Sequence, residues 1–291
     1  MTLIGVTGAP GNVGTPLVRA LLARDAQVRV LARRPEQARA AFADAPEVEV
    51  RRLEFGDRRS YVEAFRGVDR LFIVRPPQLS QVRRDMVPAL DVALGAGVTQ
   101  MVLLSLQGAE RLPFVPHAQL EAYLRESGAG YTFLRPSFFM QNLTTMHLPE
   151  LRRGEVHVPA GQGRTSFIDV RDIADVGALV LTEPGHEGRA YELTGSEALT
   201  YAEVAARLSA ATGRPIRYTD PSPLAFFHHM RARGISTGQI LVMEAIYATA
   251  RFGLAARVTP ETAQLLGRPP RSFDDFARDV APLLSQETAH A

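Results

Sequence analysis

The first fourteen residues hold the feature that most constrains how this chain folds. Residues 6–14 read V-T-G-A-P-G-N-V-G, after a short apolar run and before a helical pattern at residues 15–24. Residues 2–6 are predicted to form a buried strand. Gly8, Gly11 and Gly14 permit a tight turn, a close approach of the backbone to a ligand, and close packing of the helix on the strand. The segment therefore predicts a strand, a turn and a helix whose N-terminus binds phosphate.

This turn is predicted to bind the pyrophosphate of a dinucleotide, because unpaired N–H groups and the helix dipole both favour an anion there. The spacing is G-x-x-G-x-x-G rather than G-x-G-x-x-G. Pro10 has no N–H to donate, so we expect it to make the turn rigid. The residues expected to form the phosphate site are Thr7, Gly8, Pro10, Gly11, Asn12, Val13 and Gly14.

Composition excludes several classes of chemistry. The 291 residues include no cysteine and no lysine, so disulfides, thiolate nucleophiles, lysine Schiff bases and lysine proton relays are excluded. All 33 basic residues are arginine and the net charge is only +2, so the basic pI of 9.2 does not indicate nucleic-acid binding. No apolar run reaches the length of a membrane span and no signal peptide is evident, so we expect a cytoplasmic protein that does not contact membranes.

Strand and helix patterns alternate as in a doubly wound parallel sheet, so the predicted fold class is α/β, of the Rossmann type. Residues 1–152 are predicted to form the dinucleotide-binding domain. Residues 153–291 are predicted to form a smaller, mostly helical domain that covers the substrate, with residues 166–195 returning to the first core. The expected strands after the first are 27–32, 48–54, 70–74, 100–105, 131–134 and 191–194, and the longer expected helices are 81–96, 118–126, 201–212, 220–252 and 272–284.

The end of the second strand distinguishes NAD from NADP. An acidic residue there would bind the ribose 2′-hydroxyl, whereas this chain has Arg33 and Arg34, which suit a 2′-phosphate. NADPH or NADP⁺ is the predicted cofactor, although a solvated basic turn would look the same. Asp57 either touches the adenine or caps the following helix. Val74, Arg75 and Pro76 follow the fourth strand and are predicted to lie beside the nicotinamide ribose.

Three further segments resemble one family. Residues 131–142 read Y-T-F-L-R-P-S-F-F-M-Q-N, residues 166–174 read S-F-I-D-V-R-D-I-A, and residues 267–273 read G-R-P-P-R-S-F. These segments and the glycine turn are similar to those of the NmrA-like group of atypical short-chain dehydrogenases/reductases. The resemblance covers nearly the whole chain and implies a Rossmann fold with a small C-terminal domain. It also implies that Pro136, in the L-R-P segment, contacts the cofactor.

The chain departs from the wider superfamily at the residues that usually transfer the proton. Typical members have a serine on the fifth strand and then Tyr-x-x-x-Lys. Here Ser105 ends the fifth strand, but His117 and Glu121 occupy the positions of the tyrosine and the lysine. In one interpretation His117 is an acid whose imidazole is oriented by Glu121, four residues along the same helical face, which would raise the imidazole pKa. In the other, His117 caps the helix and Glu121 pairs with an arginine.

A reductase of conjugated acceptors needs an apolar cleft more than an acid, because quinones and dyes accept hydride readily. Phe138, Phe139, Phe227 and Tyr247 are the candidates for lining such a cleft, although each is also a good core residue. No metal site is expected, because the adjacent His228 and His229 diverge on a helix. Asp169, Asp172 and Asp175 are better explained by a helix N-terminus than by a ligand cluster.

Two classes of function remain open. The first is an NADPH-dependent oxidoreductase that transfers hydride to a quinone-like or other conjugated small molecule without the usual Tyr-Lys dyad. The alternative is a non-catalytic NADP(H)-binding regulator that senses redox state through a protein partner. A homodimer is compatible with either function.

Overall fold

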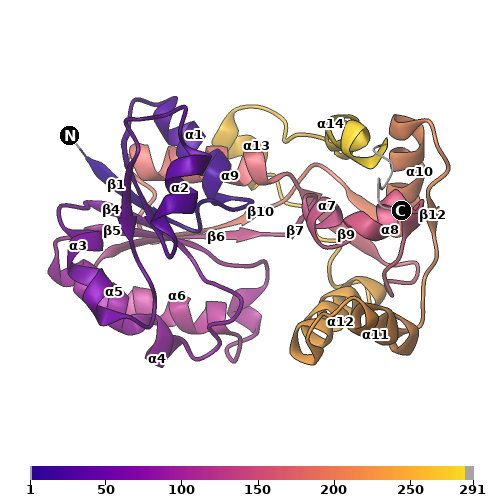
Figure 1. Ribbon diagram of the computed structural model, residues 1–291, viewed down its shortest axis with the longest axis horizontal. Helices are drawn as coiled ribbons and strands as arrows, with labels where there is room; N and C mark the ends of the chain where they lie inside the picture. The colour runs from indigo at the N-terminus through magenta and orange to yellow at the C-terminus, as the bar shows by residue number, and fades with distance from the viewer. Residues whose placement is uncertain (1, 286–291) are drawn as a thin grey trace. The chain divides into compact units, whose positions relative to one another are not determined.

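A seven-stranded parallel sheet forms the centre of one of the two units into which the chain divides (Figure 1). The computed structural model describes residues 2–285. The first unit consists of the residues up to Pro136 together with Val170–Leu193. The second unit consists of Ser137–Asp169 and the residues from Thr194 onward. The boundary therefore lies after residue 136 rather than after the predicted residue 152. The reason is that Phe138 and Phe139 already pair with a strand of the second unit.

Every neighbouring pair of strands in the large sheet is parallel. Its strands, in spatial order, are β10 (Arg189–Leu193), β6 (Gly130–Pro136), β5 (Gln100–Leu104), β4 (Arg70–Val74), β1 (Leu3–Thr7), β2 (Gln27–Ala32) and β3 (Glu49–Arg52). Strands such as β5 are buried throughout, as expected where helices cover both faces of a sheet. The Rossmann-type α/β fold predicted from the sequence is confirmed.

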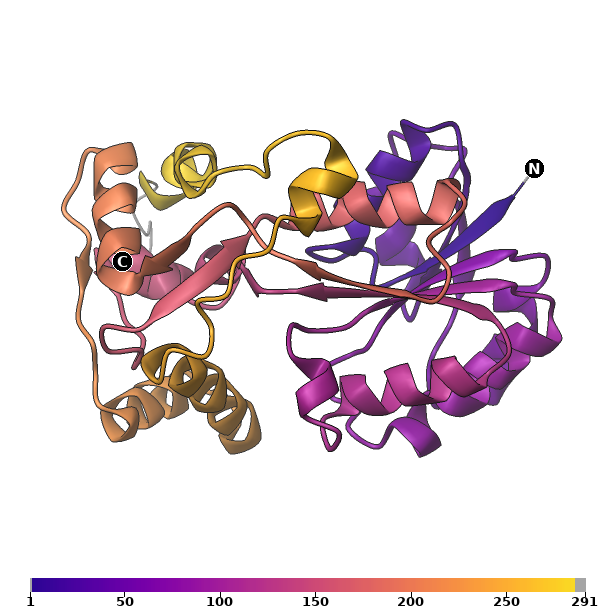
Figure 2. The ribbon, with the colours of Figure 1, turned by 180° about the vertical axis from the view of Figure 1, so that it is seen from behind.

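Helices cover both faces of this sheet. The helices are α1 (Gly14–Leu22), α2 (Pro35–Ala41), α3 (Tyr61–Phe65), α4 (Val82–Asp85), α5 (Val87–Gly95), α6 (Pro116–Glu126) and α9 (Val170–Thr182), with short 3₁₀ turns η1 (Arg58–Ser60) and η2 (Ala109–Arg111). Helices α1 and α9 lie on one face, and α5 and α6 lie on the other (Figures 1 and 2). Gly177 lets α9 approach α1 closely, since a Cβ there would be 3.1 Å from Leu17.

Two predicted helices are each divided in the structure. Residues 81–96 form α4 and α5, because Pro88 lacks an N–H and starts a new helix at its second position. Residues 220–252 form α11 (Pro223–Ala232) and α12 (Thr237–Arg251). Gly234 between them has φ of +81°, and Ser236 caps α12 in a capping box with Gln239. These stop and start signals were present in the sequence.

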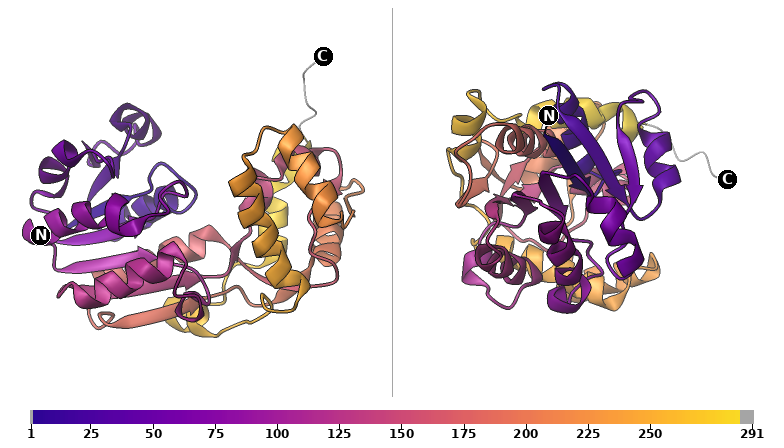
Figure 3. Two further views of the ribbon diagram at one scale, coloured as in Figure 1. Left: turned by 90° about the horizontal axis from the view of Figure 1, so that it is seen from below. Right: turned by 90° about the vertical axis from the view of Figure 1, so that its left-hand side faces the viewer.

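The second unit is built on two small sheets. In the larger one, β9 (Arg164–Ile168) lies between β11 (Ala198–Thr200), which is antiparallel to it, and β7 (Phe138–Phe139), which is parallel. The other sheet pairs β8 (Glu155–Val156) with β12 (Arg217–Tyr218). The remaining helices are α7 (Asn142–Thr145), α8 (Leu148–Arg152), α10 (Tyr201–Thr212), α13 (Glu261–Leu266) and α14 (Phe273–Ser285). Helices α11 and α12 form an adjacent pair (Figure 3).

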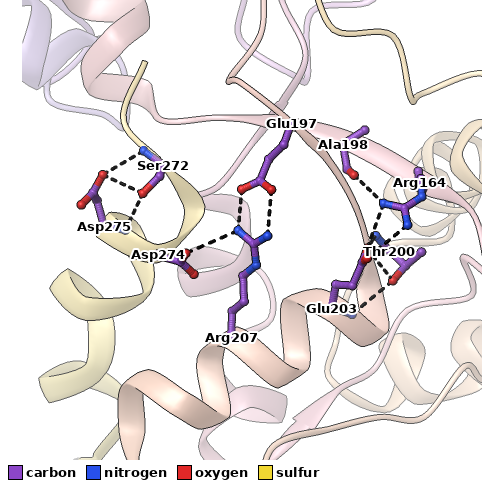
Figure 4. A network of polar contacts seen from close by, with 9 residues as sticks. All are labelled: Arg164, Glu197, Ala198, Thr200, Glu203, Arg207, Ser272, Asp274 and Asp275. Atoms are coloured by element: carbon purple, nitrogen blue, oxygen red, sulfur yellow. Dashed lines mark hydrogen bonds and ion pairs between the residues drawn. The ribbon is translucent and has the colours of Figure 1, made fainter. Parts of the chain in front are cut away.

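Helices α10 and α14 pack together, and arginines anchor α10 within the second unit (Figure 4). The Arg207 guanidinium donates to both oxygens of Glu197 and lies 3.7 Å from Asp274 at the start of α14. Arg164 on β9 pairs with Glu203, which also completes a capping box with Thr200. Two side-chain clusters therefore connect β9, β11, α10 and α14.

Candidate functional site

The strand order of the large sheet reverses between β1 and β4, and open parallel sheets bind ligands at such a point, beyond the carboxyl ends of the strands. Thr7 joins these two strand ends. Its hydroxyl donates to the Phe72 carbonyl at 3.1 Å and accepts from the Val74 N–H at 2.8 Å. Thr7 is buried, so its side chain holds the site together while its backbone leads into the turn.

The three glycines meet at one point, the carbonyl of Gly8. A Cβ on Gly11 would lie 2.5 Å from that oxygen, and one on Gly14 would lie 2.4 Å from it. Gly8 itself has φ of +79°, and a Cβ there would lie 2.7 Å from Val74. The turn is therefore too tight for any side chain at these three positions, as the sequence pattern predicted.

The turn presents backbone donors at the start of α1. The Gly11 N–H donates to the Thr15 hydroxyl at 3.1 Å. The N–H groups of Asn12, Val13 and Gly14 have no hydrogen-bond partner within residues 2–285. Unpaired N–H groups at a helix N-terminus form an anion site. The turn therefore has backbone N–H donors that fit a pyrophosphate. Pro10, in the same turn, is exposed to solvent.

Arg33 and Arg34 lie directly beyond β2, on the side of β1 away from β4. Both side chains are exposed, and neither has an ion-pair or hydrogen-bond partner among the described residues. The arginines on the neighbouring strand β3 are paired, Arg51 with Glu49 and Arg52 with Glu54 and Asp57. Two unpaired guanidinium groups at the place where a ribose phosphate is bound in this fold suit NADP.

Of the two possibilities for Asp57, the structure shows the cap. Its carboxylate accepts from the Arg59 N–H at 3.1 Å and begins η1. It also forms an ion pair with Arg52 at 2.6 Å, and that hydrogen bond is the main reason why the Asp57 pKa is lowered. The carboxylate is therefore occupied by protein donors.

The loop after β4 is held by its own arginine. The Arg75 guanidinium donates to the carbonyl oxygens of Pro76, Pro77 and Leu79, at 2.9, 3.2 and 3.0 Å. Burial lowers the Arg75 pKa. The predicted stiff segment beside the sheet edge is thus stabilised both by its prolines and by these hydrogen bonds.

Glu121 is the centre of a buried polar cluster in the first unit. Its side chain is 1% exposed and its carboxylate accepts four hydrogen bonds. The Ser105 hydroxyl donates at 2.6 Å, Arg135 donates twice at 2.9 and 2.6 Å, and Arg125 donates at 3.0 Å. Burial raises the Glu121 pKa, but the hydrogen bonds from Arg135 and Ser105 and the positive charges of Arg135 and Arg125 together lower it by more, so that the net shift is downward.

The expectation that Glu121 orients the His117 imidazole is corrected by these contacts. The carboxylate has about four lone-pair positions, and protein donors other than His117 occupy them. The alternative pairing of Glu121 with arginine is the one found. His117 does not make the cap either, since Val115 is the N-cap of α6 and no side chain caps that end.

His117 is neutral at physiological pH. Burial lowers the pKa of its imidazole to about 4, and the nearby positive charge of Arg75 lowers it further than Glu121 raises it. At pH 7 only on the order of one imidazole in a thousand would carry the second proton. This corrects the expectation of a raised pKa. Ser105 likewise differs from a free catalytic hydroxyl, because its hydroxyl donates a hydrogen bond to the Glu121 carboxylate.

The aromatic candidates for a substrate cleft belong to the second unit, where one of them is a core residue and three are half-buried. Tyr247 is 2% exposed, and its hydroxyl lies 2.5 Å from the His147 Nε2. Its ring also packs beside Phe138, so Tyr247 is a core residue rather than a lining residue. Phe138, Phe139 and Phe227 are half-buried.

No group of three or more His, Asp or Glu side chains within residues 2–285 could hold a metal ion. His229 instead donates from Nε2 to the carboxylate of the fully buried Glu150, 2.7 Å away, and His228 is exposed. Asp169 and Asp172 are also fully buried, around the start of α9. Among the residues that the structure describes, no helix is long and apolar enough to cross a membrane.

Sequence reasoning did not identify Arg135 as the partner of Glu121. Arg135 was visible only as part of the L-R-P segment, and its contact with Glu121 depends on β6 lying beside β5. Arg125 could have been found, because it stands four residues after Glu121 on the same helix.

Comparison with known proteins shows that this chain is similar to NAD(P)H-dependent reductases. The sequence model of the NmrA-like family matches residues 1–277. The chain is 36% identical to the NAD(P)H azoreductase of Xenophilus azovorans, over 95% of this chain and 97% of that protein. The NADPH complex of an NADPH-dependent quinone oxidoreductase from Escherichia coli is similar, with a TM-score of 0.85 and 26% identity over 95% and 99% of the two chains. The NADP(H) complex of Citrobacter sp. triphenylmethane reductase has a TM-score of 0.83 and 25% identity over 97% and 100%.

Proposed function

The chain belongs to the NmrA-like family, and on that premise we propose that it is an NADPH-dependent oxidoreductase that reduces a quinone-like or other conjugated small molecule. The observation that carries the proposal is the phosphate site at the switch point of the sheet. It combines a side-chain-free turn at Gly8, unpaired N–H groups at the start of α1, and the unpaired guanidinium groups of Arg33 and Arg34.

Two groups of residues would bind different parts of the cofactor. The N–H groups of Asn12, Val13 and Gly14 would bind the pyrophosphate, and Arg33 and Arg34 would bind the 2′-phosphate. When bound, NADPH supplies a hydride, which with one proton converts a quinone to a hydroquinone while the cofactor is oxidised to NADP⁺.

The chain supplies no Tyr-Lys dyad for the proton, since it contains no lysine at all. The imidazole of His117 is neutral, and Glu121 is saturated by Ser105, Arg125 and Arg135. We therefore propose that the proton comes from water. This limits the substrates to acceptors that take hydride without prior protonation, which is a property of quinones and cationic or azo dyes rather than of simple ketones.

The test is NADPH oxidation by the full chain with a panel of benzoquinones, naphthoquinones, azo dyes and triphenylmethane dyes, with a simple ketone as the negative control. Turnover of a conjugated acceptor, with NADPH preferred to NADH, is expected. Tight binding of NADPH or NADP⁺ with no turnover of any acceptor would overturn the proposal and favour the redox-sensing regulator. Size-exclusion chromatography with light scattering, with and without NADPH, would show whether the chain forms a homodimer.

A further inference from the structure

The loop between β5 and α6 carries an exposed aromatic ring on a fixed backbone. Phe114 is 72% exposed and Leu112 is 39% exposed. Isolated exposed apolar residues are common, but a large ring left open on an otherwise anchored loop at a ligand-binding edge is a candidate contact. The loop leaves the carboxyl end of β5, the same edge from which the glycine turn leaves β1.

Several contacts hold the backbone of this loop. The Gln107 N–H donates to the Pro136 carbonyl at 3.0 Å, and Ala109 is fully buried. The Gln119 side-chain amide donates to the carbonyl of Phe114 at 3.1 Å. The chain therefore fixes the backbone at Phe114 and leaves most of its ring open to solvent.

The position of the loop along the sheet indicates which end of a bound dinucleotide lies near the Phe114 ring. The phosphate turn follows β1, and the arginines suited to the adenosine phosphate follow β2 on one side. A dinucleotide bound across the switch point directs its other end over β4 and β5. Phe114 follows β5 and stands three residues before His117, whose imidazole feels the charge of Arg75 beyond β4.

We propose that the Phe114 ring forms an aromatic contact for the electron acceptor, on which a planar conjugated molecule stacks. The inference rests on the proposed reductase function and names a specificity-determining residue within it. Aromatic rings pair face to face with an offset or edge to face, with a gain beyond the area buried. The site would select flat, conjugated acceptors such as naphthoquinones over non-planar ones of similar size.

The kinetic test compares Phe114→Ala with Phe114→Tyr, which keeps a ring, and with Val62→Ala, which removes a 58%-exposed apolar side chain from α3. For Phe114→Ala we expect the KM for a naphthoquinone to rise about 3- to 30-fold, with kcat and the Kd for NADPH within about 2-fold of wild type. Phe114→Tyr should restore KM. An unchanged KM in Phe114→Ala, or an equal rise in Val62→Ala, would overturn the proposal.

A binding test does not depend on turnover. The chain contains no tryptophan, so Phe114→Trp introduces a single indole, and Val62→Trp places the same reporter elsewhere. With NADP⁺ present, a naphthoquinone should quench the fluorescence of Phe114→Trp saturably and that of Val62→Trp only in proportion to concentration. Equal quenching of both variants would refute the contact. Saturable quenching without NADPH oxidation by the wild type would retain the contact and refute the reductase.

Discussion

Replacing Glu121 by lysine tests the polar cluster of the first unit most severely. Glu121→Lys would supply the lysine that typical members of the wider superfamily have at this position. In this chain it would place an ammonium group, 1% exposed, against the guanidinium groups of Arg135 and Arg125. Four hydrogen bonds to a carboxylate would be lost at the same time.

Removing one partner of a buried ion pair costs about 3–5 kcal/mol, because the remaining charge is left uncompensated. Arg135 would keep one carboxylate partner, Glu110 at 2.8 Å, so the lower half of that range is the more relevant. Glu121→Lys should therefore lower the free energy of unfolding by about 3–4 kcal/mol. For a unit of this size the corresponding fall in Tm is about 6–16 °C.

The assay is urea unfolding followed by far-UV circular dichroism, together with Tm by calorimetry. Glu126→Lys is the matched control, because Glu126 is exposed on the same helix and the same substitution there should change stability by no more than about 0.5 kcal/mol. Glu121→Gln, which keeps the shape and loses the charge, should fall between the two. If Glu121→Lys unfolded within about 1 kcal/mol of wild type, the cluster would not be the buried ion-pair network described above.

Three further predictions concern other parts of the chain. Gly14→Ala should weaken NADPH binding and cost about 1–3 kcal/mol of stability, because its Cβ would lie 2.4 Å from the Gly8 oxygen, whereas Gly95→Ala, with open space around it, should be neutral or stabilising in the same thermal unfolding assay. Arg33→Ala should raise the Kd for NADPH about 10- to 100-fold in a fluorescence titration and leave the Kd for NADH nearly unchanged, and an equal loss for both cofactors would contradict the 2′-phosphate contact. Burial lowers the His147 pKa from 6.5 to about 4, so the folded protein binds a proton there less readily than the unfolded chain does. The free energy of unfolding therefore has its full value above pH 6.5 and falls by about 3 kcal/mol as the pH approaches 4. In urea titrations across that pH range His147→Phe should lose less stability than wild type by about this amount, and an unchanged slope would contradict the assignment.

Much of the fold could be predicted because its signals are local. The glycine turn, the alternating strands of the first unit and the return of residues 189–193 to the sheet follow from apolar runs and turn residues. The short strands β7, β8, β11 and β12 have only two or three residues each, too few to show a periodic pattern. The pairing of these strands depends on partners distant in the sequence, and the extent of the second unit depends on the same pairing.

The same distinction applies to the site. The tight turn at Gly8 and the exposed arginines beyond β2 were readable, because each depends on one segment. The sequence left two roles open for Glu121, and the choice between them depends on its contacts with Ser105, directly after β5, and with Arg135 on β6. The pKa of His117 likewise depends on burial and on Arg75, 42 positions away.

The function proposed for this chain is hydride transfer from NADPH to a conjugated acceptor without a Tyr-Lys dyad. Its most direct test is single-turnover mixing of the NADPH-loaded protein with excess naphthoquinone, using NADPH deuterated on each face of the nicotinamide C4 in turn. We expect loss of the reduced cofactor's absorbance, with a primary isotope effect for one of the two labels and appearance of the hydroquinone. Bound NADPH that stays reduced in the presence of every conjugated acceptor would contradict it.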